Sequence, residues 1–142
     1  MLGLRAGTVA AFQGAKSVDA VKRGRTRCTE RGDSNLACAR YLESMVQASD
    51  DFEMVAPVEL SIFCFRHVPM QLRSESPQVI DAFNERLLVA LQRDGSSYLS
   101  NATLGGRFAL RGCVLNYRTT LSDMDILLDD LRRVAQSLPT SA

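Results

Sequence analysis

The segment ELSIFCFRHV, residues 59–68, constrains the fold most strongly, because it is apolar on both faces of an extended strand. A strand of this kind is stable only inside a sheet whose faces are covered by other parts of the protein. The preceding segment DFEMVAP, residues 51–57, predicts a shorter strand that Pro57 ends. The sequence therefore predicts that residues 59–68 form a central strand of a covered sheet.

Residues 96–115, SSYLSNATLGGRFALRGCVL, predict two further strands joined at Gly105-Gly106 as an antiparallel hairpin. Helical segments precede, separate and follow the two strand pairs, in the order α-β-β-α-β-β-α. Two tight strand-to-strand links with helices between them indicate an α+β fold. We expect a mostly antiparallel sheet of about four strands with helices packed on one face.

The second and third helices carry clear boundary signals. Ser76 is a suitable N-cap, Pro77 suits the first helical position, and Gly95 suits the helix exit. Thr120 and Asp123 resemble a capping box that opens the last helix. The inner face of this last helix is predicted to consist of Met124, Leu127, Leu128, Leu131, Val134 and Ala135.

The first 32 residues differ in composition from the rest of the chain. They contain seven basic and two acidic residues, and five of the nine glycines. We expect residues 1–32 to be a basic, glycine-rich lead-in with poor order, although a phosphate-binding tail is an alternative. A single domain is predicted over residues 33–138, where Asp33 and Ser34 would cap the first helix.

Composition argues against several classes of function. A net charge of +1 is too small for a nucleic-acid binder that works by bulk electrostatics, and no apolar run is long enough for a membrane span. His67 has no ligand or nucleophile partner, so we expect it to be structural and expect no metal site. The four cysteines, none of them in a C-x-x-C pair, suit a reducing cytoplasm: Cys28, Cys38, Cys64 and Cys113.

Arg111 is the candidate functional residue. On a strand, Arg111 shares a face with Ala109, Cys113 and Leu115. The other face of the strand is apolar and consists of Phe108, Leu110, Gly112 and Val114. We expect the apolar face to pack against the helices and the Arg111 side to face solvent or a second protein layer. An unpaired guanidinium in such a strand needs an anion. Two readings stay open: an internal ion pair with Glu59 or Glu53, or a bidentate grip on a carboxylate ligand.

An ordered set of motifs then becomes visible between about Asn35 and about Arg133. It comprises F-E-M-V-A-P, L-S-I-F-C-F-R, N-x-x-L-L-x-x-L-x-x-x-G and F-A-L-R-x-C-x-x-N-x-R-T-T. Each motif is weak alone, but the series at these separations is specific. It resembles the C-terminal domain of the group II pyridoxal-phosphate (PLP)-dependent amino-acid decarboxylases, which include the aromatic-L-amino-acid and glutamate decarboxylases.

The resemblance implies a carboxy-lyase that works as a homodimer of fold-type I. In this family a large domain holds PLP on a Schiff-base lysine, and the cofactor is the electron sink of the reaction. The small C-terminal domain is an antiparallel sheet backed by helices. In the glutamate-decarboxylase branch, an arginine at the position of Arg111 is associated with the substrate carboxylate.

The chain has only two lysines, Lys16 and Lys22, and both lie outside the matching region. The resemblance therefore implies a fragment that is inactive alone, has no catalytic or cofactor-binding residue of its own, and contributes Arg111 to substrate binding. Its expected partners are the missing large domain, a homodimer mate and the amino-acid substrate. The alternative is a free-standing ferredoxin-like module that binds a small anion or a protein.

Overall fold

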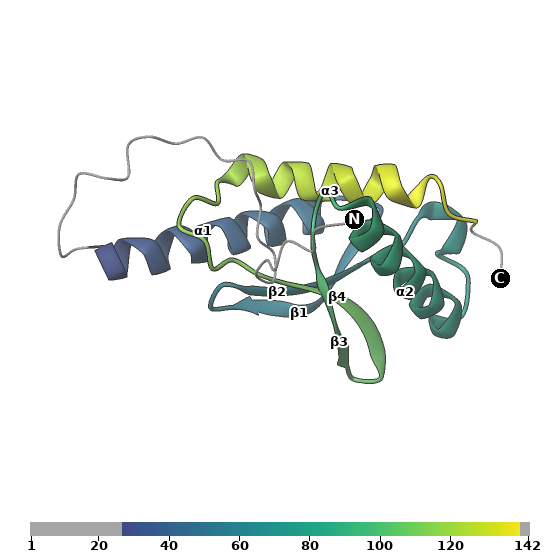
Figure 1. The fold of residues 1–142 in the computed structure, drawn as a ribbon. Helices are drawn as coiled ribbons and strands as arrows, with labels where there is room; N and C mark the ends of the chain where they lie inside the picture. The colour runs from purple at the N-terminus through teal and green to yellow at the C-terminus, as the bar shows by residue number, and fades with distance from the viewer. Residues whose placement is uncertain (1–26, 140–142) are drawn as a thin grey trace.

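The computed structural model describes residues 27–139 (Figure 1). Along the chain the elements are α1 (Arg27–Ala48), β1 (Phe52–Glu59), β2 (Ile62–His67), the short 3-10 turn η2 (Met70–Leu72), α2 (Pro77–Asp94), β3 (Ser100–Leu104), β4 (Arg107–Cys113) and α3 (Leu121–Ala135). The predicted order and the α+β class are confirmed.

The first helix starts earlier than the sequence predicted. α1 begins at Arg27, ahead of the Asp33-Ser34 pair that was expected to cap it. The predicted lead-in therefore overlaps the start of α1, and its first 26 residues lie outside the described part of the chain.

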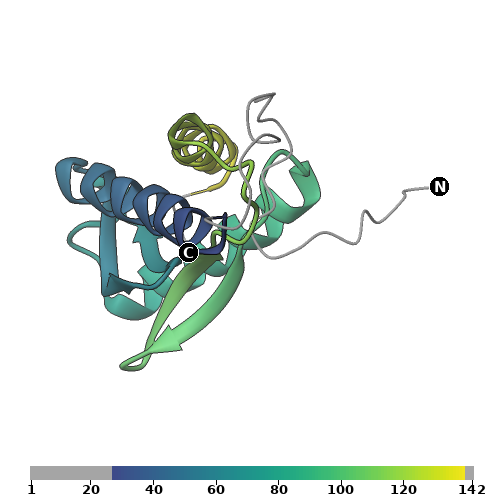
Figure 2. The same cartoon turned by 90° about the vertical axis from the view of Figure 1, so that its left-hand side faces the viewer.

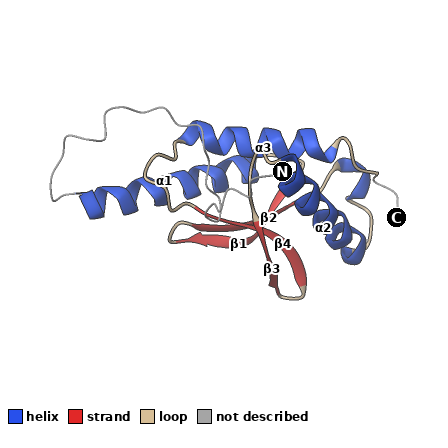
Figure 3. Ribbon diagram, in the orientation of Figure 1, coloured by secondary structure: helices blue, strands red, loops and turns tan. Residues whose placement is uncertain are grey.

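The four strands form one antiparallel sheet in the order β1-β2-β4-β3 (Figure 3). β2 and β4 are the inner strands, which confirms the central position predicted for the doubly apolar segment. Five of the six residues of β2 are buried. Each hairpin supplies one inner and one edge strand, so the sheet forms when β2 pairs with β4.

Pro57 does not end β1, and the prediction that it would was wrong: the strand continues to Glu59. Proline lacks the amide N–H that a sheet ladder uses, but an edge strand needs that donor on one side only. β1 is an edge strand, and its pairing with β2 shifts register on both sides of Ala56. The edge position explains why the proline is tolerated.

Both hairpin turns contain residues with left-handed backbone conformation. Gly105 and Gly106 have φ of 57° and 74°, as a two-residue turn between twisted strands requires. This confirms the predicted β3–β4 turn. Leu60, in the β1–β2 turn, has φ of 56° and is exposed, although it is not a glycine.

The helices cover one face of the sheet (Figure 1, Figure 2). α1 packs on β1 and β2, α2 packs on β4, and α3 lies against both α1 and α2. A single apolar core fills the space between them. Its largest fully buried side chains include Phe63, Phe65, Phe83, Leu87, Leu110, Met124 and Leu131.

The boundary signals of α2 and α3 act as predicted. Pro77 is in the first turn of α2, and Gly95 ends the helix with φ of 76°. At α3 the Asp123 carboxylate accepts hydrogen bonds from the backbone N–H of Thr120 at 2.7 Å and from its hydroxyl at 2.9 Å. The capping box is therefore present, and it sets where α3 begins.

Gly112 allows the two inner strands to pack closely. It lies opposite Phe63 in the β2–β4 register, on the face that forms the core. A Cβ atom at this position would overlap the Phe63 ring and come within 3.1 Å of Leu99 Cδ2. The ring of Phe63 thus occupies the space that a side chain at Gly112 would need.

His67 ends β2 inside an aromatic cluster. Its ring centroid is 4.6 Å from that of Phe52 and 6.0 Å from that of Phe83, and the residue is 4% exposed. The Asn84 carboxamide accepts from the His67 backbone N–H at 2.8 Å and donates to its carbonyl at 2.9 Å. Burial lowers the pKa of the imidazole, against the opposing attraction of the Asp51 carboxylate.

Three cysteines of the described region are free thiols: Cys38 and Cys64 are buried, and Cys113 is partly exposed. Within residues 27–139 no helix has both the length and the apolar character needed to cross a membrane. In the same region no three potential metal ligands come together.

We expect Gly112→Ala to destabilise the fold by about 1–3 kcal/mol, because the added methyl group overpacks the core against Phe63. Urea unfolding measures this cost. In a Phe63→Leu background the same substitution should cost clearly less, since the obstructing ring atoms are gone. An equal loss of unfolding free energy in both backgrounds would contradict the close packing of Gly112 against the Phe63 ring.

Stability should also depend on pH through His67, the only histidine of the chain. Its pKa is lower in the folded state than the value of about 6.5 expected in the unfolded chain. The unfolded state therefore takes up the proton first, and the free energy of unfolding should fall as the pH drops from about 7 to about 5. His67→Phe should flatten this part of the profile; parallel profiles for both proteins would argue against a depressed pKa.

Candidate functional site

The sheet face opposite the core carries the predicted site residue. The side chains of β2 and β4 that alternate with the core residues lie on this side of the sheet. We name it the Arg111 face and define it by Cys64, Arg66, Ala109, Arg111 and Cys113. The expectation that Arg111 faces away from the helix-covered side is confirmed.

Arg111 lies near the middle of the sheet, between Cys64 of β2 and Ser100 of β3. Its backbone carbonyl accepts a hydrogen bond from Ser100 Oγ at 3.3 Å. Its half-buried side chain forms no hydrogen bond or ion pair with any residue that the structure describes. The guanidinium is thus held on inner-strand backbone with its donors unused.

Arg66, on the same face, has the opposite environment. It is 6% exposed, and its guanidinium is paired with Glu53, directly across the β1–β2 ladder, and with Asp81 of α2 at 3.2 Å. A buried charge needs such partners. The predicted alternative of an internal ion pair for Arg111 fails in the described region, because Glu53 is used by Arg66 and Glu59 forms no ion pair with Arg111.

The positive charge of Arg111 is felt by its neighbour. Burial raises the pKa of the Cys64 thiol, and the Arg111 guanidinium opposes this rise. Cys64 is therefore a neutral thiol at pH 7 and gives Arg111 no anionic partner. A carboxylate placed against this face would meet a guanidinium that is free to donate two parallel hydrogen bonds.

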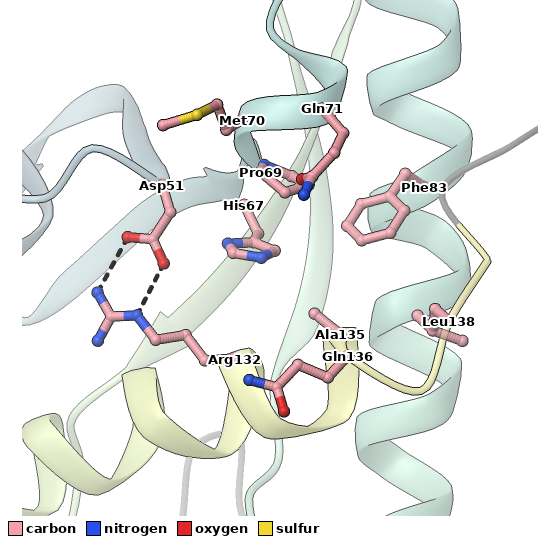
Figure 4. A pocket seen from close by; sticks show the side chains of 10 residues that line it. All are labelled: Asp51, His67, Pro69, Met70, Gln71, Phe83, Arg132, Ala135, Gln136 and Leu138. Atoms are coloured by element: carbon pink, nitrogen blue, oxygen red, sulfur yellow. Dashed lines mark hydrogen bonds and ion pairs between the residues drawn. The ribbon is translucent and has the colours of Figure 1, made fainter.

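A second site, which the sequence analysis missed, is a pocket at the ends of β2 and α3 (Figure 4). We name it the His67 pocket; its volume is about 470 Å³. Its polar lining consists of Asp51, His67, Gln71, Arg132 and Gln136. The apolar lining consists of Pro69, Met70, Phe83, Ala135 and Leu138.

One wall of the His67 pocket is an ion pair between the start of β1 and α3. Arg132 donates from Nε to Asp51 Oδ2 at 2.7 Å and from Nη2 to Oδ1 at 2.9 Å. Hydrogen bonding to Arg132 holds the pKa of the Asp51 carboxyl below its usual range. The partners are 81 positions apart in the sequence, so no local pattern could have paired them.

The His67 ring lies between this ion pair and Phe83 (Figure 4). Its Nδ1 is buried and has no hydrogen-bond partner. Unpaired buried nitrogens are uncommon, because a polar atom loses free energy when it leaves water without a new partner. The ring also interacts with the Asp51 backbone, and its packing fits the predicted structural role.

A third concave site, the Thr119 pocket, has a volume of about 410 Å³ and lies between α1 and the segment before α3. Its lining includes Ser34, Cys38, Thr119 and Leu121. Thr119 Oγ1 is buried there without a hydrogen-bond partner. This pocket is similar in size to the His67 pocket, and Tyr117 and Arg118 are also among its lining residues.

The described residues do not fit the cofactor that the resemblance implies. A PLP aldehyde is held by a lysine amine as a Schiff base, and residues 27–139 contain no lysine. The donor set of the Arg111 face suits a carboxylate and offers no group to hold an aldehyde covalently. No step of PLP chemistry can be assigned to these residues.

Comparison with known proteins gives relatives named as amino-acid decarboxylases, together with a phenylacetaldehyde synthase. No protein-family model matches the chain. The human cysteine sulfinic acid decarboxylase is 34% identical over 116 residues, which are 76% of this chain and 23% of that protein. The aromatic-L-amino-acid decarboxylase of Bacillus atrophaeus is 28% identical over 109 residues, which are 77% of this chain and 22% of that protein.

Solved structures give the same relationship. Mouse CSAD superposes with a TM-score of 0.70 at 30% identity, covering 77% of this chain and 24% of the mouse chain. Oryza sativa TDC with PLP gives a TM-score of 0.68 at 25% identity and covers 75% and 23%. The chain thus spans less than a quarter of the length of these relatives. In sequence and in fold, the chain resembles the C-terminal region of the group II PLP-dependent amino-acid decarboxylases.

Proposed function

We propose that this chain is the C-terminal small-domain part of a PLP-dependent amino-acid decarboxylase and that Arg111 binds the carboxylate of the substrate. The observation that carries the proposal is the half-buried guanidinium of Arg111, which has no partner among the described residues. The relatives support the reaction class, because their names describe decarboxylases of aromatic amino acids and of cysteine sulfinic acid.

In this proposal the Arg111 face docks against a large domain that brings the cofactor. The helices already cover the other side of the sheet, so the Arg111 face is the side left for a second protein layer. The substrate would lie between the two domains, with its carboxylate on Arg111. Arg66 would stay a structural residue, since Glu53 and Asp81 already neutralise it.

The chain alone is proposed to be inactive and to bind no cofactor, since its described part has no lysine for a Schiff base. When a large domain supplies PLP, the cofactor takes up the electron pair released with carbon dioxide. The described residues would contribute binding and orientation of the substrate. A homodimer mate is a prediction from the resemblance, and a cytoplasmic location is a prediction from the cysteine content.

A free-standing ferredoxin-like module is the second candidate, because an unpaired Arg111 could also hold a small anion without a second domain. The sheet order β1-β2-β4-β3 arises from two hairpins with a helix between them, whereas a ferredoxin-like fold interleaves its strands through split β-α-β units. The strand connections therefore favour the decarboxylase part.

The isolated chain should release no carbon dioxide from cysteine sulfinate, glutamate or an aromatic amino acid when PLP is added, because it lacks the Schiff-base lysine. Radiometric detection of carbon dioxide measures this, with a full-length relative as positive control. Release by the purified chain, with contaminating enzyme excluded, would overturn the assignment.

A chimera tests Arg111 directly. Residues 35–138 would replace the matching region of the human cysteine sulfinic acid decarboxylase, and cysteine sulfinate would be the substrate. We expect Arg111→Gln to raise KM by roughly 10- to 100-fold, because hydrogen bonds to a charged group contribute about 1.5–3 kcal/mol. Arg107→Gln, an exposed arginine on the same strand, is the matched control and should leave KM unchanged.

Two outcomes separate the hypotheses. A folded, PLP-bound chimera whose KM is the same with Arg111 and Gln at this position would exclude carboxylate binding by Arg111. Tight binding of an amino acid or PLP to the isolated chain, lost in Arg111→Ala, would instead favour the free-standing module.

A further inference from the structure

We propose that the free edge of β3 pairs with the same edge of a second copy of this chain, so that two sheets join into one continuous sheet. The proposal rests on the backbone and the composition of β3 (Ser100–Leu104). It uses no residue of a large domain, so it is independent of the decarboxylase assignment and of the homodimer that the resemblance implies.

The ladder between β2 and β4 decides which backbone groups of β3 are free. The N–H of Val114 donates to the carbonyl of Ser61 at 2.9 Å, so the two strands are hydrogen-bonded at this opposite pair. Hydrogen-bonded and non-hydrogen-bonded pairs alternate along an antiparallel ladder. The even-numbered residues of β4 therefore bond to β2, and its odd-numbered residues bond to β3.

The odd-numbered residues of β4 lie opposite Ser100, Ala102 and Leu104 of β3. The N–H and C=O groups of these three residues bond to β4, so those of Asn101 and Thr103 point away from the sheet. β3 is an edge strand, and no described strand takes up these groups. A row of unpaired backbone groups of this kind is a template for a further strand.

The free edge of β3 is open to an approaching strand. Asn101 and Thr103 are exposed, although the residues opposite them in β4 are buried. The β3–β4 hairpin projects away from the helices in both views (Figure 1, Figure 2). Just before the strand, the carbonyl of Leu99 accepts a hydrogen bond from Gln92 Nε2 at 2.8 Å, so the open stretch begins after this residue.

The other edge strand, β1, has features that discourage pairing with a further strand. It contains Pro57, Glu53 and Glu59, and its register shifts on both sides of Ala56. The sequence of β3, SNATL, contains no proline and no charged residue. The two edges therefore differ, and β3 is the one that a further strand extends.

A second copy of the chain is the partner that this edge fits best. With a two-fold axis at Ala102, Asn101 of each copy lies opposite Thr103 of the other copy. Both residues have free donors and acceptors, so each opposite pair exchanges two hydrogen bonds. Because β3 has no charged residue, two copies meet without like-charge repulsion.

The geometry of this pairing leaves the Arg111 face outside the contact. A two-fold axis between neighbouring antiparallel strands of one sheet is perpendicular to that sheet. The Arg111 faces of the two copies then lie on the same side of the joined sheet. Pairing through β3 therefore makes no use of the Arg111 guanidinium.

Sedimentation of the full chain from about 10 µM to about 1 mM measures the association, and amide hydrogen exchange locates it. We expect a dimer with a dissociation constant of about 0.1–1 mM, because interfaces this small are weak. Exchange at Asn101 and Thr103 should slow as the concentration rises. Exchange at Ala102 should change little, since its N–H already bonds to β4.

Two matched pairs of variants test the contacts, and amide spectra of the dilute proteins show whether each variant is folded. Thr103→Pro removes an outward N–H without breaking the β3–β4 ladder and should weaken dimerisation at least about tenfold. Thr103→Val keeps the N–H and should have no effect. Ala102→Lys places two ammonium groups opposite each other and should weaken dimerisation about fivefold at low salt, whereas Ala102→Gln should not.

Three results would overturn the proposal. A chain that stays monomeric at the highest concentration would show that the β3 edge does not pair. A dimer that Thr103→Pro and Ala102→Lys leave unchanged would place the interface elsewhere, as would concentration-dependent protection centred outside β3. If Thr103→Pro fails to fold, the two Ala102 variants decide the matter. None of these results bears on whether Arg111 binds a carboxylate.

Discussion

Burial of one face of a four-stranded sheet beneath three helices is the constraint on which the other features depend. The alternation of side chains along β2 and β4 sends Phe63, Phe65 and Leu110 into the core. The same alternation necessarily sends Cys64, Arg66 and Arg111 to the other side. Because Gly112 has no side chain, the ring of Phe63 can lie against it on the core side of the inner strands.

Three arginines show how tertiary contacts decide what the same side chain does. Arg66 is buried and neutralised by two carboxylates, and Arg132 joins α3 to the start of β1 through Asp51. Both stabilise the fold, because each links elements that are distant in sequence. Arg111 lies on the inner strand β4 and has no such carboxylate in the described region. Unlike Arg66 and Arg132, Arg111 has a guanidinium that is not neutralised by a described carboxylate.

The two candidate sites lie on different parts of the fold and differ in chemistry. The Arg111 face is part of the inner strands and has an unsatisfied positive charge. The His67 pocket lies where β2, η2 and the end of α3 meet, and its charges cancel within the pocket. The decarboxylase names of the relatives describe those proteins and identify neither site in this chain. The second site is defined by the residues that line it in this chain.

Local signals in the sequence determined the element order, the Thr120–Asp123 capping box, the Gly105-Gly106 turn and the side of β4 on which Arg111 lies, because each depends on residues close together in the chain. They misplaced the start of α1 and the end of β1. The end of β1 was misplaced because Pro57 is tolerated at the edge of the sheet, and only the tertiary fold puts β1 there. Only the tertiary structure decided which carboxylates pair with Arg66 and Arg132, and that His67 lines a pocket beside Asp51 and Arg132. Those outcomes depend on strand register and helix packing, which bring together side chains as far as 81 positions apart.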